Sequence, residues 1–307
     1  MVLELLSRNH DIVCLVHPSS KSKTLLGLPV QIITGDVLNV SSFESYLSSC
    51  EYVVHIAAST SVWPGRNELV NRINIEGTRN VMTASQRARI KRFIHVGSAN
   101  SFDPGTLENL GTEANGYTGW KYKNDYLDSK YKTQLMLLGE FKKNKFPVII
   151  ISPTFMLGPY DSGPTSGRLL LSMVEGKVPG YSKGVKNFVH AKDVAKAIAN
   201  AMTMGRLGEA YIAGCENMDY ATFFNKVKTI SGVEKKLIHF PFFLVLIGGF
   251  FSSIFARIIG KQPDLSYGMV RLMGIEQYYS SAKAVKELQM PQTPTDKAIE
   301  DCLNRFR

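Results

Sequence analysis

The chain has 307 residues, of which 44% are hydrophobic, 20% charged and 10% aromatic. This composition is typical of a globular protein and excludes a disordered or fibrous chain. Lys and Arg number 36 against 26 Asp and Glu, which gives a net charge of +10. Because the basic runs are short and scattered along the sequence, we expect no nucleic-acid partner.

The cysteines Cys14, Cys50, Cys215 and Cys302 are far apart and form no C-x-x-C pair. This spacing predicts buried thiols in a reducing compartment, and neither a disulfide framework nor a metal site. Histidines without metal-ligand spacing are interpreted as satisfied structural residues: His55, His95 and His190. The first residues also lack the long apolar run of a signal peptide, so a cytoplasmic protein without a metal ion is expected.

Short apolar runs alternate with amphipathic stretches in the first half of the chain. The runs predict buried strands at residues 11–16, 30–34, 52–57, 92–96 and 147–151. The stretches between them predict helices at residues 43–47, 68–87 and 124–143. Repeated strand–helix units favour a parallel sheet with helices on both faces, which is a doubly wound α/β fold.

A second, smaller lobe is predicted from a change of composition after Pro153. Residues 158–167 are rich in Gly, Pro and Ser and lead into a predicted helix. The chain then returns to the main domain before a mostly helical remainder. The two predicted units are residues 1–155 plus about 187–214 for dinucleotide binding, and about 156–186 plus 215–307 as a mostly helical substrate lobe.

Residues 237–256 contain no acidic or basic side chain and are long enough to span a bilayer. Pro241, Gly248 and Gly249 interrupt the run, so it is a poor uniform apolar helix. Lysines and an arginine flank it, as they do at a membrane surface. We favour a hydrophobic helix that covers the smaller lobe; peripheral membrane contact and a true span are the alternatives.

Ser98, Tyr126 and Lys130 are the candidate catalytic residues. Ser98 follows the predicted strand 92–96, and ligands of open α/β sheets bind at the carboxyl ends of the strands. Tyr126 and Lys130 are four residues apart at the start of a predicted helix, so both project from one face. A neighbouring ammonium lowers the pKa of a tyrosine, which then exchanges a proton with a substrate oxygen that Ser98 hydrogen-bonds. This arrangement suits hydride transfer between an alcohol and a carbonyl.

The spacing Y-x-x-x-K occurs three times, and its context selects one pair. Tyr117–Lys121 precedes the helix and contains Gly119, whereas Tyr279–Lys283 lies in the C-terminal lobe. Only Tyr126–Lys130 follows a strand-end serine and opens a helix that leads into another buried strand. We interpret the other two pairs as structural.

Taken in order, the motifs of the chain resemble those of the extended short-chain dehydrogenase/reductases. That family includes nucleotide-sugar epimerases, dihydroflavonol reductases and 3β-hydroxysteroid dehydrogenases. The matching motifs are GDV at 35–37, VVHIAAS at 53–59, NIEGTRNV at 74–81, FIHVGSANS at 93–101, YLDSK at 126–130, SPTFMLGP at 152–159, NFVHAKDVAKAI at 187–198 and GEAYIAG at 208–214. The resemblance implies a Rossmann-type doubly wound parallel sheet that binds NAD(P).

The resemblance also implies a role for each matching residue. Ser98, Tyr126 and Lys130 form the catalytic trio. The cofactor-binding set adds Asp36 and Val37 beside the adenine, Ala57 and Ala58 along the pyrophosphate and ribose, Asn74 at the active-site end of its helix, and Pro153 and Thr154 near the nicotinamide. Structural alternatives stay open, namely a helix cap for Asp36, plain packing for Ala57 and Ala58, and a core hydrogen bond for Asn74.

Cofactor preference depends on the end of the second strand of the family fold. An acidic residue there accepts the ribose hydroxyls of NAD, whereas basic residues accommodate the extra phosphate of NADP. Here His17 is followed by two serines and by Lys21 and Lys23, without a carboxylate. Related reductases often have arginine where His17 stands, so we expect NADP, with NAD as the alternative, and assign His17 and Lys21 to the cofactor site.

The family fold begins with a strand and a glycine-rich turn that hold the pyrophosphate. The first residues of this chain, MVLELLSRNHD, instead match the helix that follows that turn. Because that first strand is the centre of the family sheet, we expect two strand edges to be left unpaired. A misassigned start codon is the expected explanation, and a truncated, inactive relative is the alternative.

The sequence therefore predicts an NAD(P)-dependent reductase or dehydrogenase that acts on a carbonyl or hydroxyl of a fairly apolar small molecule. Trp63, Phe155, Met156 and residues 237–256 supply apolar side chains, and Ser152 stands where related epimerases often carry Arg or Asn. A nucleotide-sugar epimerase or dehydratase and a non-catalytic dinucleotide-sensing protein are the alternatives. Homodimers through two long helices are expected only by analogy with the family.

Overall fold

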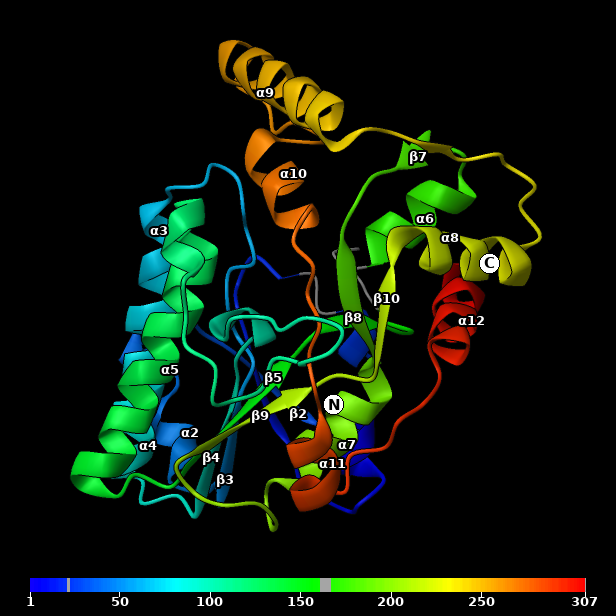
Figure 1. Ribbon diagram of the computed structural model, residues 1–307. Coiled ribbons are helices and arrows are strands. Elements are labelled where there is room, and N and C mark those ends of the chain that lie inside the picture. The colour runs from blue at the N-terminus through cyan, green and yellow to red at the C-terminus, as the bar shows by residue number, and fades with distance from the viewer. Residues whose placement is uncertain (21–22, 161–166, 307) are drawn as a thin grey trace.

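The computed structural model describes residues 1–20, 23–160 and 167–306 (Figure 1). Parallel strands in two sheets form its centre: β1 (Val13–Val16) with β2 (Gln31–Thr34), and β3 (Tyr52–His55), β4 (Arg92–Val96), β5 (Val148–Pro153) and β9 (Glu209–Ala213) in that order. The predicted strands are confirmed, because each observed end lies within two residues of the expected one. The α/β class with a parallel sheet is thereby confirmed.

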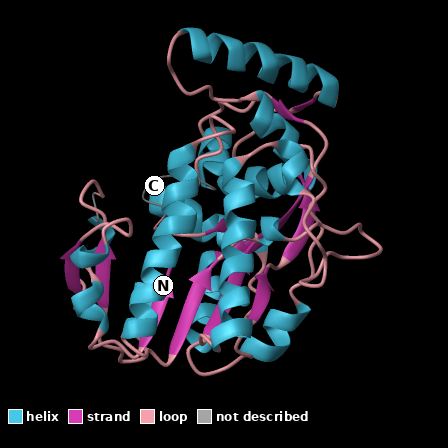
Figure 2. Ribbon diagram, turned by 90° about the vertical axis from the view of Figure 1, so that its left-hand side faces the viewer, coloured by secondary structure: helices cyan, strands magenta, loops and turns pink. Residues whose placement is uncertain are grey.

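The centre of the molecule is divided between β1 and β3. In the described part of the chain no strand is hydrogen-bonded between these two, so each has an unpaired edge. Figure 2 shows the two-stranded sheet standing apart from the larger one. This is the arrangement expected of a Rossmann-type sheet without its first strand. The chain opens instead with a short helix, whose Leu5 packs in the same apolar cluster as Ile94 of β4.

Helices cover both faces of the four-stranded sheet (Figure 1 and Figure 2). They are α1 (Val2–Leu6), α2 (Glu44–Leu47), α3 (Glu68–Asn71), α4 (Thr78–Arg87), α5 (Asp125–Asn144), α7 (Ala191–Asn200) and α11 (Ala282–Leu288), with the short turns η1 (Lys23–Leu25) and η2 (Val40–Ser42) beside β2. Phe93 of β4 joins the core under α4 and α5, and its neighbour Ile94 joins the core under α7 and α11. Burial on alternate faces explains why β4 reads as a continuous apolar run.

The predicted helix 68–87 is not regular throughout. A π-helical turn, η3 (Arg72–Gly77), separates α3 from α4. Such turns occur often at functional sites, because the extra residue redirects side chains that a regular helix would align. Here the turn carries Asn74.

The rest of the chain builds a second core around its own sheet. Its elements are β6 (Phe155–Leu157), β8 (Val185–His190), β10 (Glu216–Asp219), α6 (Gly167–Val174), α8 (Tyr220–Ser231) and α12 (Thr295–Phe306). Phe188 of β8 stacks on Phe223 of α8, with ring centroids 4.4 Å apart. The chain rejoins the large sheet with α7 and β9, whereas β8, which the sequence analysis placed largely in the main domain, pairs with β6 and β10.

An apolar helix, α9 (Phe242–Ile258), lies at one end of the molecule and contacts α10 (Tyr267–Met273) (Figure 1). The short strands β7 (Gly180–Tyr181) and β11 (Ile238–His239) pair just before it. None of the helices in the described ranges is both long and apolar enough to cross a membrane. The segment 237–256 is thus mainly helical but is not the cover of a core, because much of its apolar surface is exposed.

Candidate active site

Ser98 lies just beyond the carboxyl end of β4. The backbone N–H of Gly97 donates to Ile151 O at 2.7 Å, and a Cβ atom at Gly97 would lie 3.0 Å from Ser152 Oγ. The close approach of β5 therefore favours glycine at this position. Ser98 then leaves the strand and caps the turn η4 (Ala99–Ser101), where its Oγ accepts a hydrogen bond from Asn100 N–H at 3.2 Å.

The first turn of α5 carries Tyr126. Asn124 caps this helix, because its Oδ1 accepts hydrogen bonds from the N–H groups of Tyr126 and Leu127 at 3.1 and 3.4 Å. Its Nδ2 donates to Val62 O at 3.1 Å, which ties the cap to the loop that follows β3. The position of Tyr126 is thus fixed both by the helix and by that loop.

Tyr126 is hydrogen-bonded to Ser98, so two of the three predicted catalytic side chains meet. Burial raises the pKa of Tyr126 above its ordinary value, and the hydrogen bond with Ser98 opposes that rise. The sequence analysis expected the Lys130 ammonium to lower this pKa. That expectation is wrong for this structure, because burial is the largest influence on this pKa and leaves the phenol protonated near neutral pH.

Lys130 follows one helical turn later and is 5% exposed. Its Nζ donates to Val96 O at 3.1 Å, two residues before Ser98. Burial lowers the pKa of Lys130 to about 8. The ammonium therefore remains largely charged at neutral pH and lies next to the strand end that carries Ser98.

Two buried histidines at the ends of β3 and β4 lie near this lysine. The ring centroids of His55 and His95 are 5.5 Å apart. Burial, and then the charge of Lys130, lower the pKa of both rings, that of His55 to about 3. His55 Nε2 lies 2.9 Å from Thr78 Oγ1, but neither ring nitrogen of His95 has a hydrogen-bond partner among the described residues. The expectation of a satisfied histidine is therefore wrong for His95.

Asn74 connects the loop after β3 to α5. Its Oδ1 accepts from Ser59 N–H at 2.7 Å, and its Nδ2 donates to Ser59 O at 3.0 Å and to Ser129 Oγ at 2.9 Å. The side chain is 2% exposed. These contacts match the structural alternative for Asn74, through which it positions the loop; direct contact with a cofactor stays a prediction.

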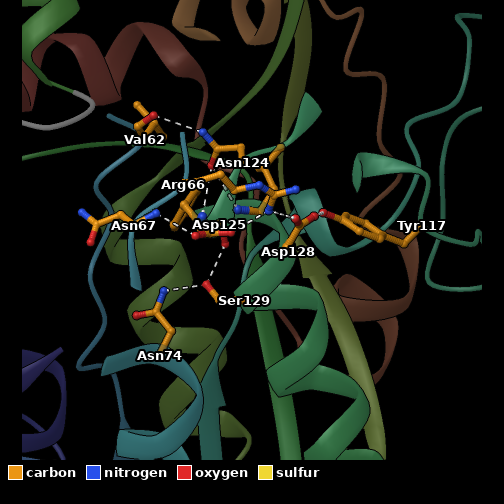
Figure 3. A network of polar contacts seen from close by, with 11 residues as sticks. Val62, Arg66, Asn67, Asn74, Tyr117, Asn124, Asp125, Asp128 and Ser129 are labelled. Carbon is orange, nitrogen blue, oxygen red and sulfur yellow. Dashed lines mark hydrogen bonds and ion pairs between the residues drawn. The ribbon is translucent and has the colours of Figure 1, made fainter. Parts of the chain in front are cut away.

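A polar network around Arg66 was not predicted from the sequence (Figure 3). Arg66 Nη1 lies 2.6 Å from Asp125 Oδ1 and 2.7 Å from Asp128 Oδ2. Asn67 N–H donates to Asp125 Oδ2 at 2.7 Å, and Tyr117 Oη donates to Asp128 Oδ1 at 2.8 Å. Two acidic residues in the first turn of a helix were the available signal, but nothing in the sequence pointed to their partner 59 residues away.

His17 and Asp36 meet beyond the ends of β1 and β2. His17 Nε2 lies 3.7 Å from Asp36 Oδ2. Since His17 Nδ1 accepts from Ser19 N–H at 3.2 Å, a neutral ring carries its proton on Nε2, toward the carboxylate. Asp36 Oδ1 also accepts from Leu38 N–H at 2.9 Å, but Leu38 lies in a turn before η2, whose cap is Asn39, so the predicted helix-capping role of Asp36 is wrong. Lys21 lies outside the described residues.

The remaining predicted cofactor residues lie at the same edge of the sheets. Ala57 is exposed and Ala58 partly buried in the loop after β3, so both have an open side, whereas Val37 is buried. Val37 packs closely against η3, since a Cβ atom at Gly77 would lie 2.7 Å from Val37 Cγ2. Pro153 ends β5 as a buried residue, and Thr154 N–H donates to Ala213 O at 3.0 Å.

The other tyrosine–lysine pairs have structural contacts. Tyr279 Oη donates to Phe102 O at 3.0 Å, while Lys283 Nζ lies 2.7 Å from Glu209 Oε2. Tyr117 is bound to Asp128, as described above. His190 is likewise structural, because its side chain caps α7 by accepting from Lys192 N–H at 3.0 Å.

The residues from which the sequence analysis inferred an apolar substrate lie in different environments. Ser152 is fully buried, so its side chain has no exposed surface in this structure. Met156 is 37% exposed, and Phe155 packs against Phe188 with ring centroids 5.4 Å apart. Trp63 lies under the Arg257 guanidinium, 5.7 Å from it.

At the carboxyl ends of the strands, the residues present suit the two ends of a dinucleotide better than its central pyrophosphate. Ser98, Tyr126 and Lys130 suit the nicotinamide end, and His17 and Asp36 suit the adenine end. Between these two ends, the backbone at Ala57 is open. In the described residues no strand lies in the sheet between β1 and β3, and so no glycine-rich turn follows one there. The residues present therefore match the cofactor at its two ends, and the sheet is open where the pyrophosphate is bound in a Rossmann-type fold.

The described residues form no metal site. No group of three or more His, Cys, Asp or Glu side chains there could hold a metal ion. Cys14, Cys50 and Cys215 are free thiols that are partly buried, and Cys302 is buried. Only Cys302 thus has the full burial expected of the thiols.

Fold and site together define a doubly wound α/β protein with a serine–tyrosine–lysine site at the carboxyl ends of its strands. A family model described as the NAD dependent epimerase/dehydratase family matches residues 1–214. The chain therefore belongs to the NAD dependent epimerase/dehydratase family, as the motifs of the extended short-chain dehydrogenase/reductases predicted.

Relatives of the chain include dehydrogenases. The protein named sterol-4-alpha-carboxylate 3-dehydrogenase, decarboxylating, of Mus musculus is 26% identical, over 90% of this chain and 80% of the relative. The sterol demethylase protein B of Methylococcus capsulatus is 25% identical, over 100% of this chain and 94% of the relative. The crystal structure of gox2253 has a TM-score of 0.85 and 27% identity, and the match covers 100% of this chain and 93% of that one.

Proposed function

We propose that the protein is an NADP-dependent oxidoreductase that interconverts a ketone and a secondary alcohol on a fairly apolar small molecule. The observation that carries the proposal is the contact between Tyr126 and Ser98 at the carboxyl end of β4, with the buried Lys130 beside it. The matching names of dehydrogenase relatives support it.

The chemistry follows from the two hydroxyl groups. Ser98 Oγ and Tyr126 Oη converge, so a substrate carbonyl oxygen placed between them accepts a hydrogen bond from each. A nicotinamide cofactor bound at this site would provide the hydride that the carbonyl carbon gains on reduction. Tyr126 donates its phenolic proton to the oxygen, which becomes the alcohol hydroxyl; oxidation reverses both transfers.

Lys130 supports the proton transfer electrostatically. Its ammonium is held at Val96 O, close to the strand end that carries Ser98. Once Tyr126 has given up its proton, the cation stabilises the phenolate that remains. Because burial raises the pKa of Tyr126, the resting phenol is protonated near neutral pH, which is the form that carbonyl reduction requires.

An apolar substrate is supported by the side chains beyond the strand ends. Met156 of β6 is exposed, and Trp63 lies in the loop that Asn124 ties to the start of α5. Two relatives carry sterol names, and sterols are apolar alcohols. An acidic residue at the position of His17 would favour NAD; because histidine stands there instead, we favour NADP.

The test is NADPH turnover by the full chain with a panel of apolar ketones, compared among the wild type, Tyr126→Phe and Tyr131→Phe. Tyr131 lies on the same helix and is stacked on Tyr117, a contact that phenylalanine retains. We expect Tyr126→Phe to lower kcat about 100-fold to 10,000-fold and Tyr131→Phe to leave it nearly unchanged. Equal rates for the two variants would remove Tyr126 from the mechanism, and conversion of a nucleotide sugar without net NADPH consumption would favour an epimerase.

A further inference from the structure

The outer face of α9 is an exposed apolar surface. Its large exposed side chains are between 42% and 76% exposed: Phe243, Leu244, Ile247, Phe250, Phe251, Ile254, Phe255, Ile258 and the adjoining Ile259. Figure 1 shows the helix lying across one end of the molecule, with α10 beneath it. A monomeric soluble protein rarely exposes a continuous apolar patch of this kind, and such patches mark interaction surfaces.

The residues of α9 that are buried against the protein are small ones. Gly249, Ser253 and Ala256 are buried. Ser253 Oγ accepts from Tyr267 N–H at 2.8 Å, and a Cβ atom at Gly249 would lie 2.9 Å from Val270 Cγ2 on α10. A helix that covers a core has the opposite arrangement, with large side chains inward. Because these close contacts fix its rotation, α9 holds its large side chains outward.

The charges around this surface are of one sign. Between Glu234 and Asp264 the chain has no acidic residue, but it has Lys235, Lys236, Arg257 and Lys261. Lys183 adds a fifth cation, whose Nζ lies 4.8 Å from the ring centroid of Phe242 at the start of α9. An apolar face bordered by lysine and arginine complements an anionic lipid surface, where headgroups meet the cations and acyl chains meet the apolar side chains.

We propose that α9 docks the protein onto an anionic phospholipid bilayer, lying in the plane of the interface with its phenylalanine and isoleucine side chains among the acyl chains. The helix has 17 residues, and no described helix qualifies as a membrane span, so it is an interfacial element. Its exposed large side chains carry no hydrogen-bonding group, which a specific protein partner would use for recognition and a lipid interior does not require.

Docking through α9 brings the bilayer to the end of the molecule that holds the candidate active site. Arg257 on α9 stacks over Trp63 in the loop after β3. On the neighbouring α10, Arg271 Nη2 donates to Lys121 O at 3.3 Å, in the turn η5 (Gly119–Tyr122) just before the cap of α5. The lipid surface and the Ser98–Tyr126 pair would therefore share one side of the protein.

Vesicle flotation of the full chain tests the docking. The probes are vesicles of phosphatidylcholine alone and of phosphatidylcholine with phosphatidylglycerol. We expect the wild type to float with the anionic vesicles, and the double variant Phe251→Asp, Phe255→Asp to bind at least tenfold more weakly. Leu107→Asp is the matched control, because Leu107 is 67% exposed on a loop outside α9 and should not affect flotation. Lys261→Glu should weaken binding to the anionic vesicles only.

A wild type that stays out of both vesicle fractions overturns the proposal. So does a wild-type dimer that the double variant converts to monomers in sedimentation velocity while flotation is unchanged, since α9 would then cover a second copy of the chain. Phe251→Trp gives an independent measurement that needs no charge in the apolar face. Its tryptophan emission should shift to the blue on addition of anionic vesicles, whereas that of Leu107→Trp should not. Equal shifts for the two variants would contradict docking.

Discussion

The Arg66 guanidinium lies 2.6 Å from the carboxylate of Asp125, although 59 residues separate the two in the chain. Asp125 precedes Tyr126 in the first turn of α5, and Arg66 belongs to the loop after β3. The contact therefore holds the tyrosine-bearing helix against the loop that borders the predicted cofactor site. A residue outside the predicted catalytic trio thus helps to position the helix start that carries Tyr126.

We expect Arg66→Met to destabilise the fold by about 2 kcal/mol, because it leaves two nearly buried carboxylates without their cation. Asp125 and Asp128 side chains are 11% and 8% exposed, although Arg66 itself is 58% exposed. Urea unfolding measures the change. The control is Arg72→Met, whose exposed partner Glu76 is 3.8 Å away, and which should cost less than about 0.5 kcal/mol. Equal losses for the two variants would show that the Arg66 network does not stabilise the start of α5.

His17 gives a prediction about cofactor preference. His17→Arg places a permanent guanidinium beside Asp36, where a 2′-phosphate would be bound in the family fold. We expect NADPH to bind about tenfold more tightly and NADH to bind as before, because a hydrogen bond to a charged group contributes about 1.5 to 3 kcal/mol. Calorimetric titration of both nucleotides measures this. A parallel gain for NADH would place the arginine on a group that the two cofactors share.

The division of the sheet predicts unequal protection of backbone amides. β1 and β2 form a two-stranded sheet with residues that are mostly exposed or partly buried, whereas β5 is fully buried between β4 and β9. Isolated strand pairs are marginally stable, so we expect amides in β1 and β2 to exchange at least about 100-fold faster than those in β4 and β5. Hydrogen exchange followed by mass spectrometry reads this directly. Equal protection would mean that β1 and β2 unfold only together with the main sheet.

Local sequence patterns predicted the features that depend on local physics. The apolar runs located β1 to β5, and Ser98 and Tyr126 meet because a strand end and a helix start both face the same sheet edge. The division between β1 and β3 followed from the absence of the family's first strand motif. These predictions required only periodicity and the order of motifs.

Contacts between distant segments were not predictable in this way. No pattern linked Arg66 to Asp125, or showed that His95 is buried without a hydrogen-bond partner among the described residues. The direction of the Tyr126 pKa shift was also missed, because burial, which raises this pKa, depends on packing from several elements that no local pattern shows. The exposed face of α9 was misjudged for the same reason, since the residues that it buries are the small ones, Gly249, Ser253 and Ala256.

Lys186 on β8 provides a pH-dependent prediction away from the catalytic trio. Its buried Nζ donates to Leu272 O at 3.0 Å and Gln277 Oε1 at 2.8 Å, and burial lowers its pKa to about 7. Between pH 7 and the ordinary lysine value of 10.5, the unfolded chain therefore binds the proton that the folded chain has released. The free energy of unfolding must rise with pH across that window.

We expect the free energy of unfolding of the wild type, relative to Lys186→Met, to increase by about 2.5 kcal/mol from pH 6 to pH 9. Taking the difference cancels Lys130 and every other group that titrates equally in both proteins. The same difference measured against Lys196→Met, an exposed lysine on α7, should stay near zero. A difference that stays flat over this range would show that the folded protein keeps Lys186 charged, and that its two hydrogen bonds offset the cost of burying the ammonium.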